Sequence, residues 1–459
     1  MKKQPAWIKQ LQKLLPKNEV LVSEKALKAH SGDRWFAANL PEVVVDARST
    51  ETVSKTLKFA HKKGIPVTPR GAGHGYVGGC VPLKGGISLS VAKMKRIKEV
   101  HERDFVAVVQ PGVITAQLQE RAEKKGLYYP PDPASRKDCS IGGNIATNAG
   151  GPKCLKYGVT RDYVMGMEVV LADGTVVRLG GRNHKNKTGF DLHRIFVGSE
   201  GMLGIVTEAT LKLLPLPPYA ASLSVGFATM KEAAHALRTI FASGFLPCAL
   251  EVADEFTLAA ARKRTGSNMF DGCKAHVIVE LDGLEGGVKA DLRELRKVIK
   301  ALDPVFIKAA NGKEACERIW DLRREFSYSL RDTGLTKLNE DIVVPRGRLE
   351  DLFRFTAKLQ KKYGLPIACF GHAGDGNIHV NVMVDMDDPD KVAKQDEVLD
   401  QLFGQIVAWG GAITGEHGVG IAKSPWWDIA TSPESRALHH LVKDSLDPKG
   451  LLNPGKFLG

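Results

Sequence analysis

The sequence predicts an α+β fold in two domains, and three observations support the prediction. At 459 residues the chain exceeds the roughly 250 to 300 residues at which one hydrophobic core stops growing. Alternating apolar runs and glycine-rich segments fill residues 41–215, as expected for short strands with helices between them, and Asp173-Gly174 is a hairpin turn signal. Beyond that region, helical patterns such as residues 230–243 alternate with strand-like runs such as residues 275–281.

A cluster of prolines at residues 214–218 marks the predicted boundary between the domains, because it interrupts any regular element. We therefore expect a first domain at residues 1–215 and a second at residues 216–415. Residues 416–459 contain a turn-rich stretch near their end and are expected to pack back on the first domain.

Composition and charge narrow the classes of partner. The chain has 65 Lys and Arg against 52 Asp and Glu, and this net charge of +13 favours phosphate-bearing cofactors, small carboxylates, acidic proteins or acidic lipid. Basic residues lie in short scattered patches and aromatic residues make up only 7%, so nucleic acid is not expected as a partner. Since no apolar run approaches the roughly 20 residues of a membrane span, we expect a soluble protein.

The spacing of the cysteines and the N-terminal segment indicate where in the cell the protein is expected. The seven cysteines are dispersed without a CxxC pair and no signal peptide precedes them, which predicts a cytoplasmic protein without an iron–sulfur cluster of its own. The segment around Trp7 is apolar at helical spacing and interleaved with lysines. It fits a first helix packed on its own domain, or an interfacial helix that holds the protein at the inner face of a membrane.

Two glycine-rich segments are predicted to bind the anionic part of a cofactor, although either could be a turn without a ligand. Residues 69–79 follow a short strand candidate, and their glycines allow backbone amides to converge on an anion. They lack the acidic ribose-binding residue of a βαβ dinucleotide site. Residues 140–151 repeat this chemistry, and two such segments suit a pyrophosphate plus a ring system. A third segment, residues 197–207, has glycines where the backbone must approach something closely.

The order and spacing of these segments resemble the FAD-binding half of the vanillyl-alcohol-oxidase (PCMH) type of flavoprotein, the FAD-linked oxidase family. The resemblance implies FAD, with residues 70–79 on its pyrophosphate. His74 stands where the glycolate oxidase branch usually has threonine; it would either bind flavin covalently or hydrogen-bond near the phosphates. The residues that the resemblance assigns to FAD are Pro69, Arg70, Gly71, Ala72, Gly73, His74, Gly75, Gly78, Gly79, Pro131, Asp132, Ser140, Gly142, Gly143, Asn144, Asn148, Gly150, Gly151, Gly201, Gly204, Ile205, Val206 and Asn453.

A glycine turn followed by an alternating strand forms the predicted substrate region at residues 371–382. Asn377, His379 and Asn381 share one face of this strand. The turn can bring His372 round to meet His379, and two neighbouring neutral imidazoles are typical of a metal pair or a catalytic pair.

Further on, residues 411–420 enclose an adjacent carboxylate and imidazole between glycines. Neighbours in an extended backbone point to opposite sides, so we expect Glu416 and His417 to have different tasks, one toward a metal and one toward substrate. A buried ion pair is the alternative.

The motifs Gly-His-x-Gly-Asp-Gly-Asn-x-His and Gly-Glu-His-Gly resemble the cap domain of the glycolate oxidase flavin subunit, D-lactate dehydrogenase and D-2-hydroxyglutarate dehydrogenase. The resemblance implies an α+β cap with an antiparallel sheet, in which His372, His379 and Glu416 bind a divalent metal, zinc, and His417 acts as base. Arg323 matches a family pattern in which a planar arginine clamps the substrate carboxylate, and Lys337 is a further catalytic candidate.

The expected activity is FAD-dependent dehydrogenation of a small D-2-hydroxy acid, glycolate or D-lactate, to the 2-oxo acid. The metal would acidify the hydroxyl, His417 would remove its proton and hydride would pass to flavin. Electrons would then pass to a quinone, a cytochrome, an electron-transfer flavoprotein or an iron–sulfur subunit, and we expect a homo-oligomer or a subunit of a complex. The alternatives are a D-2-hydroxyglutarate dehydrogenase, the flavin subunit of an oxidase with another substrate, an ether-lipid synthase and a non-catalytic assembly subunit.

Overall fold

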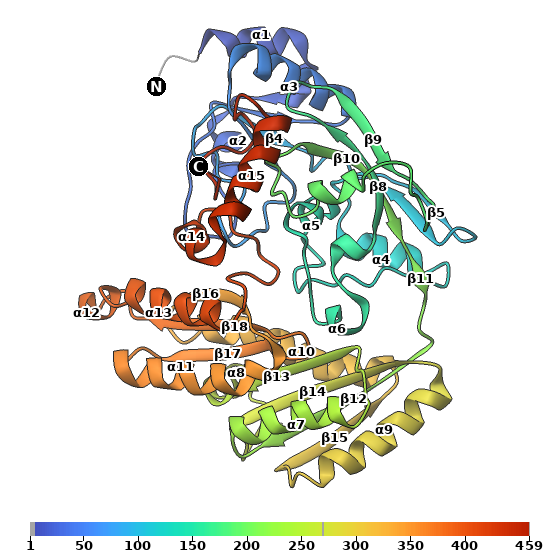
Figure 1. The fold of residues 1–459 in the computed structure, drawn as a ribbon, viewed down its shortest axis with the longest axis vertical. Coiled ribbons are helices and arrows are strands. Elements are labelled where there is room, and N and C mark those ends of the chain that lie inside the picture. The colour runs from blue at the N-terminus through green and yellow to red at the C-terminus, as the bar shows by residue number, and fades with distance from the viewer. Residues whose placement is uncertain (1–4, 269, 459) are drawn as a thin grey trace. The chain divides into compact units, whose positions relative to one another are not determined.

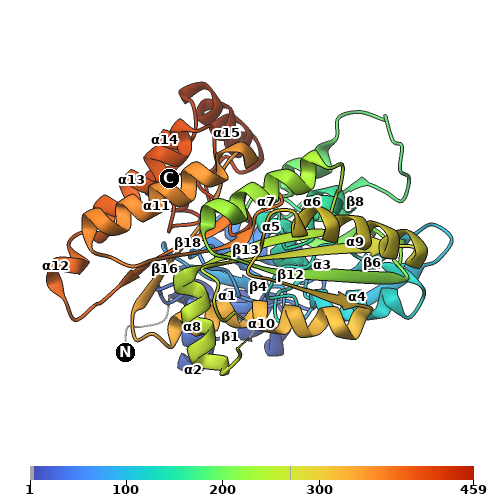
Figure 2. The same ribbon diagram turned by 90° about the horizontal axis from the view of Figure 1, so that it is seen from below.

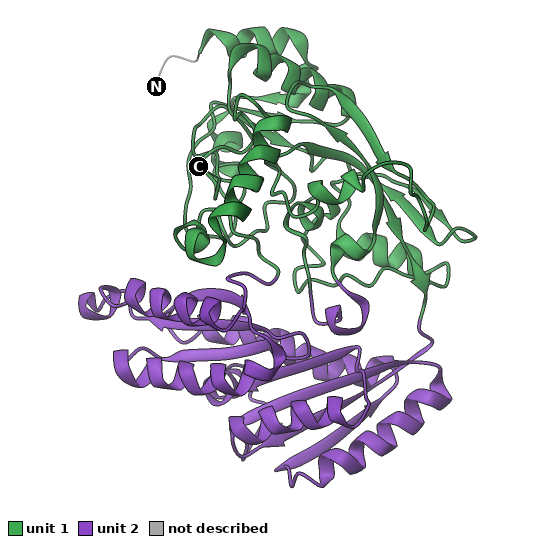
Figure 3. Ribbon diagram, viewed as in Figure 1, with its two compact units in different colours: residues 1–150, 159–216, 416–459 green, residues 151–158, 217–415 purple. Residues whose placement is uncertain are grey.

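A computed structural model describes residues 5–268 and 270–458 (Figure 1). The chain divides into two compact units (Figure 3): unit 1 contains residues 1–150, 159–216 and 416–459, and unit 2 contains residues 151–158 and 217–415. Among the described residues, no helix combines the length and the apolar character that a membrane crossing requires.

Unit 1 contains a small mixed sheet of four strands in the order β1-β2-β4-β3, in which β2 and β3 run parallel to β4 and β1 runs antiparallel to β2. The strands are β1 (Val20–Leu21), β2 (Val43–Asp46), β3 (Val67–Arg70) and β4 (Ile87–Ser90). Helix α3 (Thr50–Lys63) begins at Ser49, whose side chain accepts from the backbone of Thr52, and ends at Gly64 with a φ of 65°. Its buried Val53 and Leu57 join the core of this sheet.

The N-terminal helix α1 (Ala6–Leu14) packs on the same core through Ile8 and Leu11, which are 1% and 0% exposed. Partly buried Trp7 lies against this core and contacts the ring of Phe59. The structure therefore favours a first helix packed on its own domain.

The larger sheet of unit 1 has five antiparallel strands in the order β5-β6-β10-β8-β9. Strand β10 alternates buried and half-buried residues, as expected for a sheet with one covered face. Gly174, with a φ of 88°, lies in the turn between β8 and β9, which confirms the predicted hairpin. The strands are β5 (Ile97–His101), β6 (Val106–Val109), β8 (Val164–Val170), β9 (Val176–Gly180) and β10 (Ile205–Lys212), and a separate pair is formed by β7 (Leu127–Tyr128) and β11 (Leu214–Pro215). The other helices of unit 1 are α2 (Glu24–Ala29), α4 (Thr115–Glu123), α5 (Ile141–Thr147), α14 (Trp427–Ala430) and α15 (Pro433–Leu446).

Unit 2 is built on a seven-stranded antiparallel sheet in the order β15-β12-β14-β13-β17-β18-β16. Figure 2 shows α7, α9, α11 and α13 on one side of this sheet and α8 and α10 on the other. The strands are β12 (Tyr219–Phe227), β13 (Ala249–Asp254), β14 (Ala275–Gly283), β15 (Phe306–Asn311), β16 (Thr336–Val343), β17 (Ile367–His372) and β18 (Asn377–Val384). The helices are α6 (Cys154–Tyr157), α7 (Met230–Ala242), α8 (Glu255–Thr265), α9 (Glu285–Lys300), α10 (Lys313–Arg331), α11 (Leu349–Tyr363), α12 (Pro389–Val392) and α13 (Gln395–Ala408).

Strand register places a row of polar side chains on the sheet face under α8 and α10. Directly paired residues of antiparallel strands project to the same face, and Asp341 pairs with His379. Trp320 of α10 covers this face and donates its Nε1–H to Glu280 on β14 at 2.5 Å. The polar residues of this face include Glu251, His276, Glu280, Lys337, Asn339, Asp341, His372, His379 and Asn381. The opposite face is mostly apolar, with polar exceptions such as Asp254 and Glu340, so the register gathers most polar side chains of the sheet on one face.

The short segment that contains α6 interrupts unit 1 in sequence but packs with unit 2. Lys156 lies 2.5 Å and the Tyr157 hydroxyl 2.7 Å from the carboxylate of Asp282. The sequence had suggested that this segment belongs to the first domain, because nothing local distinguishes it from the glycine-rich residues before it.

Candidate active site

Two of the glycine-rich segments meet in unit 1. Ser140 begins α5, and its Oγ accepts hydrogen bonds from the backbone N–H of Gly143 at 3.4 Å and of Ala72 at 3.2 Å. A Cβ on Gly71 would lie 2.7 Å from the same Oγ, so the loop after β3 approaches α5 as closely as only glycine allows.

The third segment joins the same arrangement. A Cβ on Gly201 would lie 2.3 Å from Cγ of Pro69, so this loop packs directly on the first one. The Nδ2 of Asn453 donates to the backbone oxygens of Gly79 at 2.9 Å and Glu200 at 2.8 Å, which ties the two loops together. Its Oδ1 is buried without a hydrogen-bond partner in the described part of the chain. A close backbone cradle with an unsatisfied buried acceptor fits a polar cofactor such as FAD.

Several predicted cofactor residues use their side chains to hold the loops. The guanidinium of Arg70 donates to the backbone oxygen of Gly32 and to Sγ of Cys80. Asn144 donates to Oγ1 of Thr115 at 2.8 Å, and Asn148, with a φ of 51°, accepts from the backbone of Arg161 at 2.9 Å. At least part of the hydrogen-bonding capacity of these side chains therefore holds the loops themselves.

The sequence predicts either covalent flavin attachment at His74 or a hydrogen bond from this residue near the phosphates. Its Nε2 lies 3.9 Å from the carboxylate of Asp138. Burial and the positive charge of Arg34 lower the pKa of His74, so the imidazole is predominantly neutral at neutral pH. Both proposed roles, covalent attachment and hydrogen bonding near phosphates, stay predictions.

The other predicted cofactor residues lie along these same segments. Gly73 and Gly78 have positive φ values of 68° and 71°. A Cβ on Gly142 would lie 2.6 Å from Pro111, and the backbone N–H of Gly151 donates to Sγ of Cys154 in unit 2. Pro131 and Gly150 are buried, Asp132 is half-buried, Gly75 and Gly79 lie in the first loop, Gly204 precedes β10, and Ile205 and Val206 begin it.

The predicted base His417 lies beside the cofactor loop of unit 1, with its ring centroid 5.4 Å from that of Tyr76. Sequence reasoning missed the residue that holds its loop, Glu200, which is separated from it by more than 200 positions. The carboxylate of Glu200 accepts the backbone N–H groups of Val419 at 2.7 Å and Gly420 at 2.9 Å. Burial raises the pKa of Glu200. The base and the cofactor loop are thus positioned by one network within unit 1.

The predicted metal ligands come together at the end of the polar sheet face. His372 ends β17 and His379 lies on β18, with ring centroids 5.6 Å apart. Glu416 directly follows Gly415, whose backbone N–H donates to Asp341 at 2.9 Å. One ligand atom from each of His372, His379 and Glu416 lies within 4.8 Å of the others. Two imidazoles and a carboxylate are a donor set that zinc uses in catalytic sites, so the residues fit a metal.

Sequence reasoning also missed Glu251, which contacts two of the predicted site residues, His372 and Arg323. Its Oε1 lies 2.6 Å from Nδ1 of His372, and its Oε2 lies 2.7 Å from Nε and 2.6 Å from Nη2 of Arg323. The guanidinium of Arg323 also lies 4.8 Å from the ring centroid of Phe370. Burial alone would raise the pKa of Glu251, but the charges and hydrogen bonds of His372 and Arg323 lower it to about 2. Arg323 is therefore engaged by a carboxylate of the protein itself.

Other polar residues of this sheet face form hydrogen bonds within unit 2. Asn377 donates to Asp341 at 2.7 Å, and Asn381 donates to the backbone oxygens of Ala368 and His379. Lys337 on β16 donates to Oγ of Ser327 at 2.7 Å. Burial and, to a smaller extent, Arg331 lower the pKa of Lys337 to about 8.

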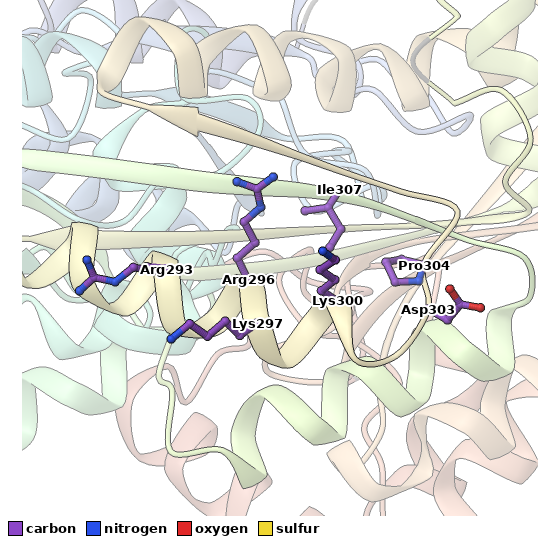
Figure 4. A pocket seen from close by; sticks show the side chains of 7 residues that line it. All are labelled: Arg293, Arg296, Lys297, Lys300, Asp303, Pro304 and Ile307. Carbon is purple, nitrogen blue, oxygen red and sulfur yellow. The ribbon is translucent and has the colours of Figure 1, made fainter.

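A cavity of about 500 Å³ lies elsewhere in unit 2, beside α9 and the edge strand β15 (Figure 4). It is lined by Arg293, Arg296, Lys297, Lys300, Asp303, Pro304 and Ile307. All five charged side chains are exposed, and Lys297 pairs with Glu294 at 2.9 Å. These are the features of a solvated basic surface.

Two family models match the chain. The model of the FAD binding domain matches residues 41–180, and that of the C-terminal domain of FAD linked oxidases matches residues 216–457, more than half of the chain. Over 419 residues the chain is 38% identical to the glycolate oxidase subunit GlcD of Bacillus subtilis, covering 91% of this chain and 89% of that protein. It is 35% identical over 457 residues to the D-lactate dehydrogenase of Archaeoglobus fulgidus, covering 99% of each.

Solved structures share the fold at lower identity. The 4-ethylphenol oxidase from Gulosibacter chungangensis superposes with a TM-score of 0.79 at 21% identity, covering 98% of this chain and 96% of that one. An alkyldihydroxyacetonephosphate synthase gives a TM-score of 0.77 at 20% identity, covering 99% and 85%. These likenesses concern the fold alone, whereas the family models and the closer sequences determine membership. The chain is therefore an oxidoreductase that belongs to the FAD-linked oxidase family.

Proposed function

We propose that the protein is an FAD-dependent dehydrogenase that oxidises a small D-2-hydroxy acid, glycolate or D-lactate, to the 2-oxo acid. The observation that carries the proposal is the group of His372, His379 and Glu416, because two imidazoles and a carboxylate leave a metal with open positions. The relatives named as a glycolate oxidase subunit and D-lactate dehydrogenases support the substrate class.

Both non-protein groups have residues that suit them. The loops around Gly71, Ser140 and Gly201 would hold FAD, which when bound supplies a two-electron acceptor for hydride. His372, His379 and Glu416 would hold a divalent metal, zinc, which when bound supplies a Lewis acid for the substrate hydroxyl.

The side chains of the protein would bind the substrate and move its proton. His417, held beside Tyr76, would take the proton of the 2-hydroxyl group. Lys337 would attract the substrate carboxylate, since a buried ammonium is a strong partner for an anion. Arg323 would add to this positive field while its Nε and Nη2 stay on Glu251.

The electrons would leave through a separate acceptor, a quinone, a cytochrome, an electron-transfer flavoprotein or an iron–sulfur subunit. With a quinone as acceptor, the protein would be cytoplasmic and would act at the inner face of a membrane. The relatives named as subunits support a role in a complex.

Anaerobic flavin reduction tests the proposal directly. The flavoprotein should lose its flavin absorbance on addition of glycolate or D-lactate but not of L-lactate. A chelator should prevent this reduction of the flavin, and added zinc should make the reduction possible again. His417→Ala should keep FAD and lose the reduction, because the hydroxyl proton has no acceptor. A flavoprotein that no 2-hydroxy acid reduces would contradict the substrate class. Reduction that is indifferent to chelator would contradict the metal.

A further inference from the structure

We infer that Glu251 is a positioning residue that fixes the tautomer of His372, so that Nδ1 carries the proton and Nε2 faces the metal. The metal part of this inference rests on the proposed function. The tautomer part concerns the protein alone.

The geometry of Glu251 makes Nδ1 of His372 a hydrogen-bond donor. Glu251 lies on β13, is 1% exposed, and places Oε1 2.6 Å from Nδ1 of His372. An ionised carboxylate only accepts hydrogen bonds, so Nδ1 must donate. In a neutral imidazole with a protonated Nδ1, Nε2 holds the lone pair that binds a metal. The neighbouring His379 ring, 5.6 Å away between centroids, lies among the same group of possible ligands.

Arg323 keeps this acceptor ionised and in place. Its Nε and Nη2 both contact Oε2 of Glu251, the oxygen that His372 does not use. Because the guanidinium also lies over the ring of Phe370, it is held on two sides. Direct contacts therefore run from Arg323 through Glu251 to His372, the proposed metal ligand. A carboxylate behind a histidine ligand also raises the basicity of the ligand.

A plain buried ion pair is the competing explanation, and the same sheet provides its control. Glu280 lies on the neighbouring strand β14, is 3% exposed, and faces the same side of the sheet. It accepts from Trp320 at 2.5 Å and from Ser222 at 3.1 Å. Replacing either glutamate by glutamine removes one buried negative charge from the same layer, but Glu251 alone of these two contacts His372.

The first measurement needs no variant. Imidazole ¹⁵N spectra of the chelator-treated full-length flavoprotein, with His372 assigned by comparison with His372→Asn, should show His372 protonated at Nδ1 only. Protonation at Nε2 in the wild-type protein would overturn the inference, whether or not the protein binds zinc.

The second measurement is zinc affinity by competition with a chromophoric chelator. Glu251→Gln should weaken zinc binding by about 10- to 100-fold, the usual loss when the carboxylate behind a histidine ligand is changed. Its His372 spectrum should change, because the amide can also donate to Nδ1. Glu280→Gln should leave both readouts as in the wild type.

The outcomes separate the two proposals. Equal zinc affinity in folded Glu251→Gln and Glu280→Gln would overturn the positioning role. If the wild type binds no zinc but Glu251→Gln changes the His372 tautomer, the metal in the proposed function fails and the tautomer inference stands. If Glu251→Gln does not fold, the wild-type spectrum still decides the tautomer.

Discussion

The buried ammonium of Lys337 predicts a pH dependence of substrate binding. Burial lowers its pKa to about 8, so the side chain is charged below that pH and neutral above it. If it attracts the substrate carboxylate, KM should rise as pH increases through 8, by about 10-fold or more, since a charge-assisted hydrogen bond contributes about 1.5–3 kcal/mol. Steady-state kinetics across this range measure the effect.

A matched pair of variants isolates Lys337 from other titrating groups. Lys337→Arg keeps its charge at all these pH values and should give a flat KM, while Lys337→Met should show the high KM throughout. A wild-type KM that does not change with pH would remove Lys337 from the substrate site.

His379 and Glu251 show which residues of this site the sequence could predict and which it could not. His379 could be placed on a polar face with Asn377 and Asn381 because a strand alternates with a period of two. Glu251 could not be found, since its partner His372 lies 121 positions away and its own strand shows no local polar motif. A contact of that span depends on strand order, which one sequence does not reveal.

At the scale of elements, the loop after β3 and the start of α5 form one cradle, and Gly71→Ala tests it. The added Cβ would lie 2.7 Å from Oγ of Ser140, so either the loop must shift or this Oγ must rotate and lose its hydrogen bonds to Ala72 and Gly143. Overpacking of this kind costs about 1–3 kcal/mol, which corresponds to roughly 5- to 150-fold weaker FAD binding if the strain falls on the loop. Flavin titration of the FAD-free protein measures it.

Gly181→Ala, in unit 1 but outside the glycine-rich segments assigned to FAD, is the control. A Cβ there meets none of the described atoms within 4 Å, and FAD affinity should stay as in the wild type. Equal FAD affinity in Gly71→Ala and the wild type would show that the cradle tolerates the added methyl group and does not hold the cofactor closely.

Elements differed in how far the sequence predicted them. The hairpin of β8 and β9 was predictable because Asp-Gly between alternating runs defines a turn locally. The packing of α6 in unit 2 was not, because it depends on contacts such as Tyr157 with Asp282, 125 positions apart. That the glycine-rich segments bind a ligand stays a prediction. The side chains of Arg70 and Asn453 hold backbone groups, a role that composition does not distinguish from ligand binding.

At the scale of the whole molecule, two compact units predict two unfolding transitions, which the proposed ligands, FAD and zinc, would shift differently. Apart from Gly151, the segments predicted to hold FAD lie in unit 1, whereas the strands that carry His372 and His379 lie in unit 2. A ligand stabilises the unit that binds it by RT ln(1 + [L]/Kd), about 2.7 kcal/mol at a free concentration 100 times Kd. In calorimetry of the full chain, FAD should therefore raise the transition of unit 1 and zinc mainly that of unit 2.

Two variants assign the transitions. Gly71→Ala should reduce the shift caused by FAD and keep the shift caused by zinc, because it overpacks a loop of unit 1. His372→Asn should do the reverse, because it removes a proposed zinc ligand in unit 2. A single transition that both ligands raise together would mean that the units unfold cooperatively.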